Sequence, residues 1–145
     1  KREFIMAFDY KDHGKEPYVI ELEAMTLDNT NYRTTIWTGE NLQMTLMEIE
    51  PGDDIGLEVH NGIDQFLRIE GGKGLCKMGP AEDNLTFEKE VEDGSGIFVP
   101  AGTWHDVVNT GDEPLKLYTV YAGPDHLPGT VHETHQDAID DPNEH

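Results

Sequence analysis

Short runs of alternating apolar and polar residues, separated by turn residues, occupy most of the chain. They span residues 18–22, 33–38, 43–49, 56–60, 65–70, 74–78, 84–91, 96–99, 105–109 and 115–122. A period of two is typical of strands that bury one face. Ten such runs at this spacing predict an all-β sandwich or barrel with antiparallel strands.

Turn residues lie at the boundaries of these runs, at Pro51-Gly52, Asn61-Gly62, Gly71-Gly72, Asp93-Gly94 and Gly111-Asp112. Helix is scarce, and the best helical turn lies at 134–139. It belongs to an acidic segment, 125–145, which we expect to pack loosely or to be partly disordered. We therefore predict one domain over 1–145, with a barrel core at about 18–124 and a peripheral tail at 125–145.

Composition narrows the classes of partner. The 145 residues, with no linker-like stretch, suit a single domain. Thirty acidic residues against ten basic ones give a net charge of -20, which repels nucleic acid and anionic membranes. The sequence contains no run of about 18 apolar residues, so no membrane-spanning helix is predicted. Cys76 is the single cysteine, which we interpret as a buried apolar residue in a cytoplasmic protein.

Four polar residues are placed by the pattern to converge on one point. Alternation puts Glu58 and His60 on the same face of their run. After the Asn61-Gly62 turn the chain returns through Gln65, which can face the same point from the next strand. A second tight turn precedes His105, which starts a later run. Two imidazoles, a carboxylate and an amide oxygen can therefore meet.

This donor set suits one divalent transition metal. Two histidines with one carboxylate can bind Fe, Mn, Ni, Co or Zn, whereas Ca and Mg prefer shells of oxygen alone. The amide of Gln65 is a weaker, neutral donor, so positions around the metal should stay open to water or substrate. We predict metal ligands at Glu58, His60, Gln65 and His105, with no organic cofactor, and the identity of the metal stays open.

The two segments resemble the paired motifs of the cupin superfamily. The second motif, Gly-x5-Pro-x-Gly-x2-His-x3-Asn, is matched in full at Gly94, Pro100, Gly102, His105 and Asn109. The resemblance covers about 42–122. It implies a small, single-domain, metal-binding cupin: an antiparallel double-stranded β-helix, or jelly-roll barrel, with six core strands and the site inside.

The first cupin motif is matched at Gly52, His60 and Gly72 but departs from the family twice. Glu58 replaces the first His of the motif, and Gln65 replaces its usual Glu. One anionic ligand therefore remains, but at a different position in the ligand set. Because an imidazole ligand is lost, affinity for later transition metals should weaken. The resemblance also implies that Pro100 and Gly102 shape the turn before His105, and that Asn109 is structural.

Other polar residues have simpler interpretations. We read five histidines as satisfied polar residues: His13, His126, His132, His135 and His145. The segment 132–135 is not a zinc-protease helix, because Gln136 stands where that motif needs its second His. One alternative for the site stays open, in which Glu58 and Gln65 form a structural hydrogen-bonded pair in a metal-free barrel.

The expected function is that of a metalloenzyme acting on a small molecule, with oxygenase-type chemistry slightly favoured. A sugar or sugar-phosphate isomerase or epimerase is one alternative, and a non-catalytic barrel that binds or senses a small ligand is another. Fold alone does not choose among these classes. No residue other than Glu58 presents itself as a separate catalytic base, and the catalytic residues stay unassigned.

The outer surface and the pocket wall are predicted less sharply. Apolar positions that point outward, Val59, Phe66 and Trp104, predict a homodimer formed through a sheet face. The candidate residues for the pocket wall are Trp37, Gln43, Met44, Met47 and Tyr118. The pattern does not decide which face of their strands points inward.

Overall fold

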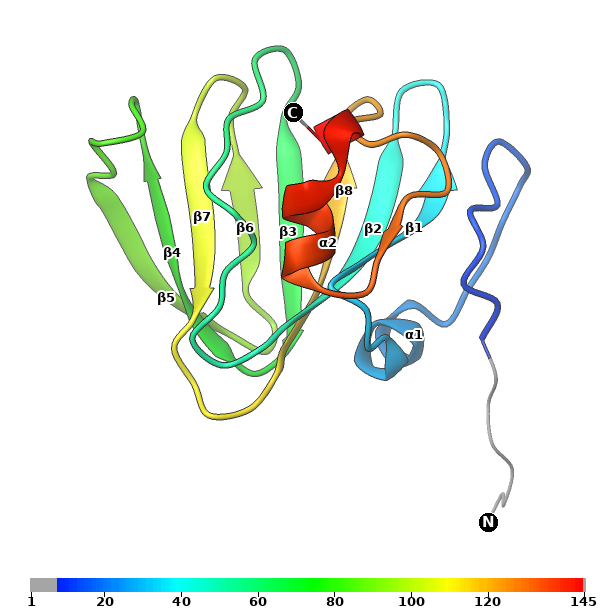
Figure 1. Cartoon of the computed structure of the whole chain (residues 1–145), viewed down its shortest axis with the longest axis horizontal. Coiled ribbons are helices and arrows are strands. Elements are labelled where there is room, and N and C mark those ends of the chain that lie inside the picture. The colour runs from blue at the N-terminus through cyan, green and yellow to red at the C-terminus, as the bar shows by residue number, and fades with distance from the viewer. Residues whose placement is uncertain (1–7, 145) are drawn as a thin grey trace.

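The computed structural model describes residues 8–144, which form two antiparallel sheets facing each other (Figure 1). The larger sheet has the strand order β6-β3-β8-β2-β1-β9 and the smaller sheet the order β5-β4-β7. The strands are β1 Arg33–Thr38, β2 Gln43–Ile49, β3 Gln65–Gly71, β4 Lys73–Gly79, β5 Phe87–Glu92, β6 Gly96–Val99, β7 Trp104–Asn109, β8 Leu115–Tyr121 and β9 Val131–His132. This is the predicted antiparallel double-stranded β-helix.

Three short helical segments accompany the sheets. Helix α1, Leu22–Asp28, lies beside the larger sheet and contacts β8 and β3. Helix α2, His135–Asp140, and the 3-10 turn η1, Pro142–Glu144, follow β9 near the end of the chain. Figure 1 shows α2 in front of β3 and β8 of the larger sheet, and its Ala138 packs against the buried core.

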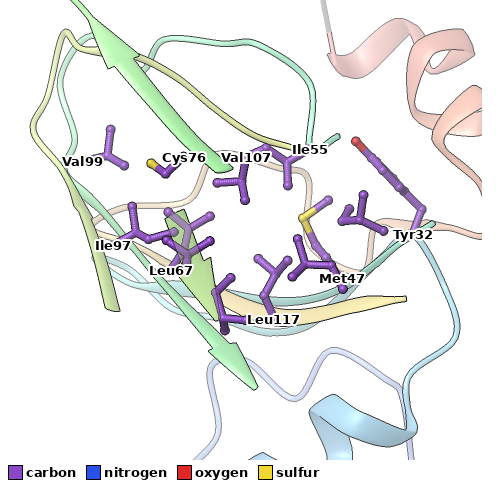
Figure 2. Close-up of a cluster of buried hydrophobic side chains, with 13 residues drawn as sticks. Tyr32, Met47, Ile55, Leu67, Cys76, Ile97, Val99, Val107 and Leu117 are labelled. Atoms are coloured by element: carbon purple, nitrogen blue, oxygen red, sulfur yellow. The ribbon is translucent and has the colours of Figure 1, made fainter. Parts of the chain in front are cut away.

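The core consists of side chains from the facing sides of both sheets. Met47, Leu67 and Leu117 come from the larger sheet, while Cys76 and Val107 come from the smaller one (Figure 2). All five are at most 2% exposed. Burial of such side chains stabilises the fold by about 1.5–3 kcal/mol each. As predicted, Cys76 is a buried, free cysteine.

One end of the inner face is polar rather than apolar. Gln65 lies opposite Tyr121 in the β3–β8 pair, and Tyr121 lies opposite Gln43 in the β2–β8 pair. Directly opposed residues share a face, so these three side chains form a row across the interior. Beside that row, the hydroxyls of Thr45 and Thr119 lie 2.6 Å apart. The strand register thus concentrates polar groups where the candidate ligands converge.

The structure also answers which pocket-wall candidates face inward. Gln43 and Met47 lie on the inner face, and Met47 belongs to the main core. Met44 and Tyr118 lie on the outer face, packed against the cluster of Met25, Ile36 and Leu46. The Trp37 indole donates its N–H to the backbone oxygen of Glu16, at 2.8 Å.

Eight of the ten predicted runs contain strands, and the two exceptions have clear causes. In the run 18–22, Val19 is 92% exposed while Ile20 and Leu22 pack on the outer face of the larger sheet. The alternation therefore arises because one side of this extended segment packs on the sheet and the other side faces solvent. No strand pairs with the segment. The chain then enters α1, which the pattern did not predict. In the run 56–60, only an isolated bridge from Glu58 to His105 forms.

The acidic segment after Pro124 is more closely integrated than its composition indicates. The predicted helical turn is present as α2, and Thr134 and Asp137 form a capping box at its start. Strand β9 pairs with β1, and His126 and His132 are buried. Hydrogen bonds and ion pairs, such as those of His126 with Glu144 and His132 with Asp141, hold this segment against the sheet together with the packing of Ala138 on the core.

Among the described residues, 8–144, no helix is long and apolar enough to cross a membrane.

Candidate metal centre

The backbone brings two predicted ligands together from distant parts of the sequence. The Glu58 N–H donates to the His105 carbonyl oxygen at 3.1 Å, and the His105 N–H donates to the Glu58 carbonyl oxygen at 2.9 Å. This bridge extends the smaller sheet beyond β7. Because the two residues are directly opposed, their side chains emerge on the same face.

The turn between β6 and β7 positions the second histidine. Gly102 has φ +80°, a conformation that glycine adopts readily, and the Thr103 N–H donates to the Pro100 carbonyl at 3.1 Å. The Gly102 N–H also donates to the His60 carbonyl at 2.7 Å. The predicted turn is therefore present, and it fixes the backbone at both histidines.

Glu58, His60 and His105 meet as a compact group. Glu58 Oε1 lies 3.2 Å from His60 Nε2 and 3.9 Å from His105 Nε2. One ligand atom from each residue lies within 4.8 Å of the others. The two imidazole centroids are 5.2 Å apart. A divalent ion that binds one carboxylate and two imidazoles needs donor atoms grouped in this way.

The second nitrogen of each imidazole has its own partner. His60 Nδ1 lies 3.1 Å from Asp125 Oδ1, and His105 Nδ1 lies 3.1 Å from the Thr103 carbonyl oxygen. Both partners can only accept, so each Nδ1 carries a proton. The Nε2 atoms are thereby directed toward Glu58. Metal-binding histidines are commonly oriented by such outer hydrogen bonds.

Gln65 supplies the fourth predicted donor, from the start of β3. Its side chain is 4% exposed, and Tyr121, its partner in the register, also contacts the His60 ring edge-on at 5.5 Å. Gln65 Oε1 and His105 Nε2 are both buried without a hydrogen-bond partner. Buried polar atoms are rarely left unsatisfied, and a metal ion held by Glu58, His60 and His105 would satisfy His105 Nε2. The residues present therefore fit a bound metal.

The alternative pairing of Glu58 with Gln65 is not what the structure contains. The Glu58 carboxylate bonds His60, and Gln65 Oε1 has no hydrogen-bond partner. The structure groups Glu58, His60 and His105, and Gln65 as a fourth ligand stays a prediction.

Protonation in the protein without a cation follows from the same contacts. Burial lowers the pKa of His60, but hydrogen bonds to Asp125 and Glu58 outweigh burial and raise the pKa to about 10. Burial lowers the pKa of His105, which leaves its ring neutral and its Nε2 lone pair available. A positive charge between the two carboxylates is therefore strongly favoured, and a metal ion can supply it in place of the proton.

The centre is enclosed on one side and reachable on another. The side chains of His105 and His60 are 1% and 7% exposed, whereas those of Asp125 and Glu58 are 27% and 32% exposed. Solvent and small molecules can therefore approach along the carboxylates. Tyr121, at the floor of the site, is fully buried, and burial raises the pKa of its phenol, which stays protonated.

Two further groups of acidic and histidine side chains occur within 8–144, and both have other roles. His135 Nδ1 lies 2.7 Å from Asp53 Oδ1, and its ring stacks on Tyr32. His132, Asp141 and Glu144 form the other group, in which the Arg33 guanidinium already contacts His132 at 3.0 Å. A fixed positive charge at that position opposes a metal ion.

The remaining sequence interpretations are largely confirmed. Hydrogen-bond partners are present for His126, His132 and His135, as expected of satisfied polar residues. His13 differs, because its ring stacks on Tyr18 and its buried Nε2 lies 3.2 Å from Asp9 without forming a hydrogen bond; His145 lies outside the described residues. Asn109 has the predicted structural role: its Nδ2 donates to the Ile49 and Glu113 carbonyls, at 2.8 Å each. Asp125 and Tyr121 were missed, since neither lies in a recognisable motif.

Comparison with known proteins bears on the family and the fold. Residues 45–121 match the model of the Cupin domain family. The Bacillus subtilis protein YrkC is 54% identical over 129 residues, which cover 89% of this chain and 69% of YrkC. Protein L612 of Acanthamoeba polyphaga mimivirus is 38% identical over 115 residues, which cover 79% of this chain and 70% of L612.

A solved structure extends the likeness to three dimensions. The crystal structure of BH2720 from Bacillus halodurans superimposes with a TM-score of 0.88 at 54% identity, covering 89% of this chain and 98% of BH2720. The match includes the two-sheet barrel within which the candidate centre lies. On the family model, these relatives and the observed fold, the chain belongs to the cupin family.

Proposed function

We propose that this cupin is a metalloenzyme that holds one divalent transition metal, Fe, Mn, Ni, Co or Zn, on Glu58, His60, Gln65 and His105. The observation that carries the proposal is the compact group of Glu58, His60 and His105, together with His105 Nε2 and Gln65 Oε1, which are both buried without a hydrogen-bond partner. In the described chain no other group supplies both of these atoms with a partner.

The surrounding residues prepare the site. Asp125 and the Thr103 carbonyl hold the Nδ1 protons of His60 and His105, which keeps both Nε2 atoms directed inward. Gln65 supplies a neutral oxygen, so the set carries one negative charge. When bound, the metal supplies a Lewis-acid or redox-active centre whose remaining positions can take substrate or oxygen.

We favour an oxygenase-type reaction on a small molecule. Two histidines with one carboxylate leave adjacent positions for two exogenous ligands, and the weak amide donor adds little competition. A metal-dependent isomerase requires a separate base at the substrate. Glu58, the exposed carboxylate nearest the centre, is committed as a ligand in this proposal. Access along Glu58 and Asp125 suits a small substrate.

The proposal is tested by metal analysis of protein purified without chelators. We expect about one equivalent of metal per chain in the wild type and a large loss in Glu58→Ala and in His105→Ala. Glu82→Ala, at an exposed position away from the barrel interior, should retain the wild-type content. Absence of stoichiometric metal from the wild type would refute the site.

The reaction class is tested separately on the loaded protein. Oxygen consumption should accompany turnover of a member of a panel of diketones, catechols and thiols. Isomerisation of a sugar phosphate without oxygen uptake would replace the oxygenase proposal with an isomerase. A loaded protein that binds members of the panel but turns none of them over would support a non-catalytic binding barrel.

We also propose a cytoplasmic location and no nucleic-acid or membrane partner. The single, buried, unpaired Cys76 and the net charge of -20 support this proposal.

A further inference from the structure

A buried arginine lies on the inner face of the larger sheet, apart from the metal ligands. Arg33 begins β1 and is 3% exposed. Its partner in the β1–β9 pair is His132, whose Nδ1 lies 3.0 Å from Arg33 Nη1. Burial of a guanidinium is costly unless anionic or hydrogen-bonding partners surround it. The anion that Arg33 meets therefore indicates what the site accommodates.

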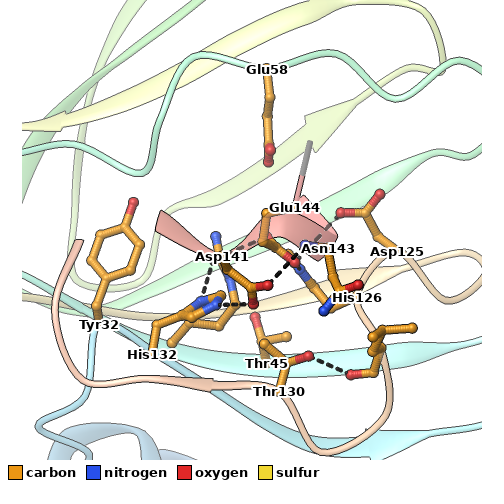
Figure 3. Close-up of polar contacts among 12 residues, drawn as sticks. Tyr32, Thr45, Glu58, Asp125, His126, Thr130, His132, Asp141, Asn143 and Glu144 are labelled. Carbon is orange, nitrogen blue, oxygen red and sulfur yellow. Dashed lines mark hydrogen bonds and ion pairs between the residues drawn. The ribbon is translucent and has the colours of Figure 1, made fainter. Parts of the chain in front are cut away.

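That anion is a side chain from the end of the described chain. Glu144 Oε1 lies 3.5 Å from Arg33 Nη1, and Glu144 Oε2 lies 2.8 Å from His126 Nδ1 (Figure 3). Burial raises the pKa of Glu144, but His126 and Arg33 outweigh burial and hold the pKa below its ordinary value. Glu144 is therefore an ionised carboxylate held between two buried cationic or donor side chains.

The Glu144 carboxylate does not use all of the hydrogen-bonding atoms near Arg33. Arg33 Nε is buried without a hydrogen-bond partner, and so is the Thr35 hydroxyl oxygen two residues along the same strand. Thr35 lies opposite Thr45, which faces inward. A carboxylate can bind a guanidinium through two parallel hydrogen bonds, whereas Glu144 approaches a single nitrogen, Nη1, at 3.5 Å. The site is built for an anion and is incompletely filled.

This anion site adjoins the metal centre. His126 Nε2 lies 3.1 Å from the Tyr121 hydroxyl, and the ring of Tyr121 contacts His60. Asp125, the residue before His126, holds His60 Nδ1. In Figure 3 the Glu58 carboxylate points toward the side on which Glu144 and Asp125 lie. A small molecule could therefore contact Arg33 at one end and the metal centre at the other.

The segment that carries Glu144 is anchored in a way that permits release. Glu144 lies on η1, none of whose residues is buried, so withdrawal of η1 alone exposes little apolar surface, while α2 can keep its Ala138 packed against the core. The contacts of Asp141 and Glu144 are ionic or polar: Asp141 lies 2.9 Å from His132 and Glu144 lies 2.8 Å from His126. A free anion can replace contacts of this kind one for one.

We propose that Arg33 and His126 form a binding site for a small carboxylate, which Glu144 occupies in this structure and which the substrate of the metal centre takes over by displacing Glu144. The link to the metal centre rests on the proposed function, whereas the carboxylate site itself does not. A carboxylate, rather than a phosphate, is chosen because the present occupant is a carboxylate. A surface of net charge -20 repels anions, and Arg33 offsets that repulsion locally.

The direct test is titration of the 15N-labelled full chain with sodium acetate, against sodium chloride and acetamide at matched ionic strength. Acetate should shift the amide signals of Asn143 and Glu144 saturably and increase their hydrogen exchange. Chloride and acetamide should leave both unchanged. Unaltered signals with acetate, or a response to inorganic phosphate without one to acetate, would overturn the proposal.

Variants assign the effect to the named residues. Glu144→Gln weakens the internal competitor, so acetate should bind about fivefold more tightly or better. Glu133→Gln, an exposed acid in the same segment, should leave the affinity unchanged. The double variant Arg33→Gln/Glu144→Gln removes both charges together, which avoids a lone buried charge, and should abolish saturable binding. Retained binding in the double variant would contradict the assignment to Arg33.

Metal analysis of the same samples separates this inference from the proposed function. Acetate binding in a protein without stoichiometric metal would refute the metalloenzyme and leave the carboxylate site standing. Stoichiometric metal without acetate binding would refute the carboxylate site alone.

Discussion

His60 Nδ1 lies 3.1 Å from Asp125 Oδ1, which ties a ligand of the candidate metal centre to the segment that follows the barrel. The contact fixes the orientation of the imidazole and directs Nε2 toward Glu58, 3.2 Å away. Such outer carboxylates orient metal-bound histidines and increase their basicity. The relationship also joins the metal centre to the adjoining carboxylate site, since Asp125 precedes His126.

Asp125→Asn should weaken metal binding without removing a ligand. The amide can still accept a hydrogen bond from His60 but carries no charge, so we expect the dissociation constant for Zn²⁺ to rise about 10- to 100-fold. Competition titration with a metal-sensitive dye measures this change. Asp112→Asn, an exposed acid in a distant turn, is the matched control. Equal affinity in the two variants would show that Asp125 does not support the centre.

Cys76 should be unreactive in the folded protein. Burial raises the pKa of its thiol to about 11, with a smaller contribution from Asp106, and its side chain faces the core. The reactive thiolate is therefore scarce at pH 8 to 9, where an exposed cysteine alkylates readily. We expect negligible labelling by a thiol reagent at pH 8 until guanidinium unfolds the chain. Rapid labelling of native protein would place Cys76 in an accessible site.

Asn109→Ala should destabilise the fold. The Asn109 amide joins the ends of β2 and β7 by donating to the carbonyls of Ile49 and Glu113. Its loss leaves both oxygens without this donor, which should lower the free energy of unfolding by about 1–3 kcal/mol. Urea denaturation measures the change. The control variant Asn84→Ala, at an exposed turn, should change the free energy of unfolding by less than about 0.5 kcal/mol.

We propose that the protein forms a homodimer through the outer face of the larger sheet. Phe98 is 74% exposed there and packs against Phe66 at a centroid distance of 4.9 Å, beside the exposed Leu42. An exposed apolar group of this kind favours association. Equilibrium sedimentation at micromolar concentration should give a dimer, and Phe98→Asp should give a monomer. Glu88→Lys, which changes an exposed residue on β5 of the smaller sheet, should remain dimeric; a monomeric wild type would contradict the proposal.

Much of the fold could be predicted because its signals are local. The alternation of apolar residues located most strands, and the spacing from Gly94 to Asn109 located the turn before His105. Helix α1 was missed because seven residues contain too few turns for a helical period to be distinguished from strand alternation. In that segment Leu22 and Met25 lie on one face of a helix, but their spacing is a single repeat.

The partners of the site could not be predicted, because they depend on how distant segments return to the barrel. Asp125 meets His60, and Glu144 meets Arg33, across long sequence separations. Acidic residues in a polar segment look alike in sequence, and nothing in the pattern separates Asp125 from the exposed Asp140. Only the observed packing identifies His60 as the partner of Asp125, and His126 and Arg33 as the partners of Glu144.

Anomalous diffraction tests the central claim most directly. Crystals of protein purified without chelators would be measured above and below the absorption edge of the metal found by elemental analysis. The account predicts one strong anomalous peak within coordination distance of Glu58, His60 and His105, with Gln65 Oε1 turned toward it. A peak at the group of Asp53, Asp54 and His135 instead, or no peak among the four predicted ligands, would contradict it.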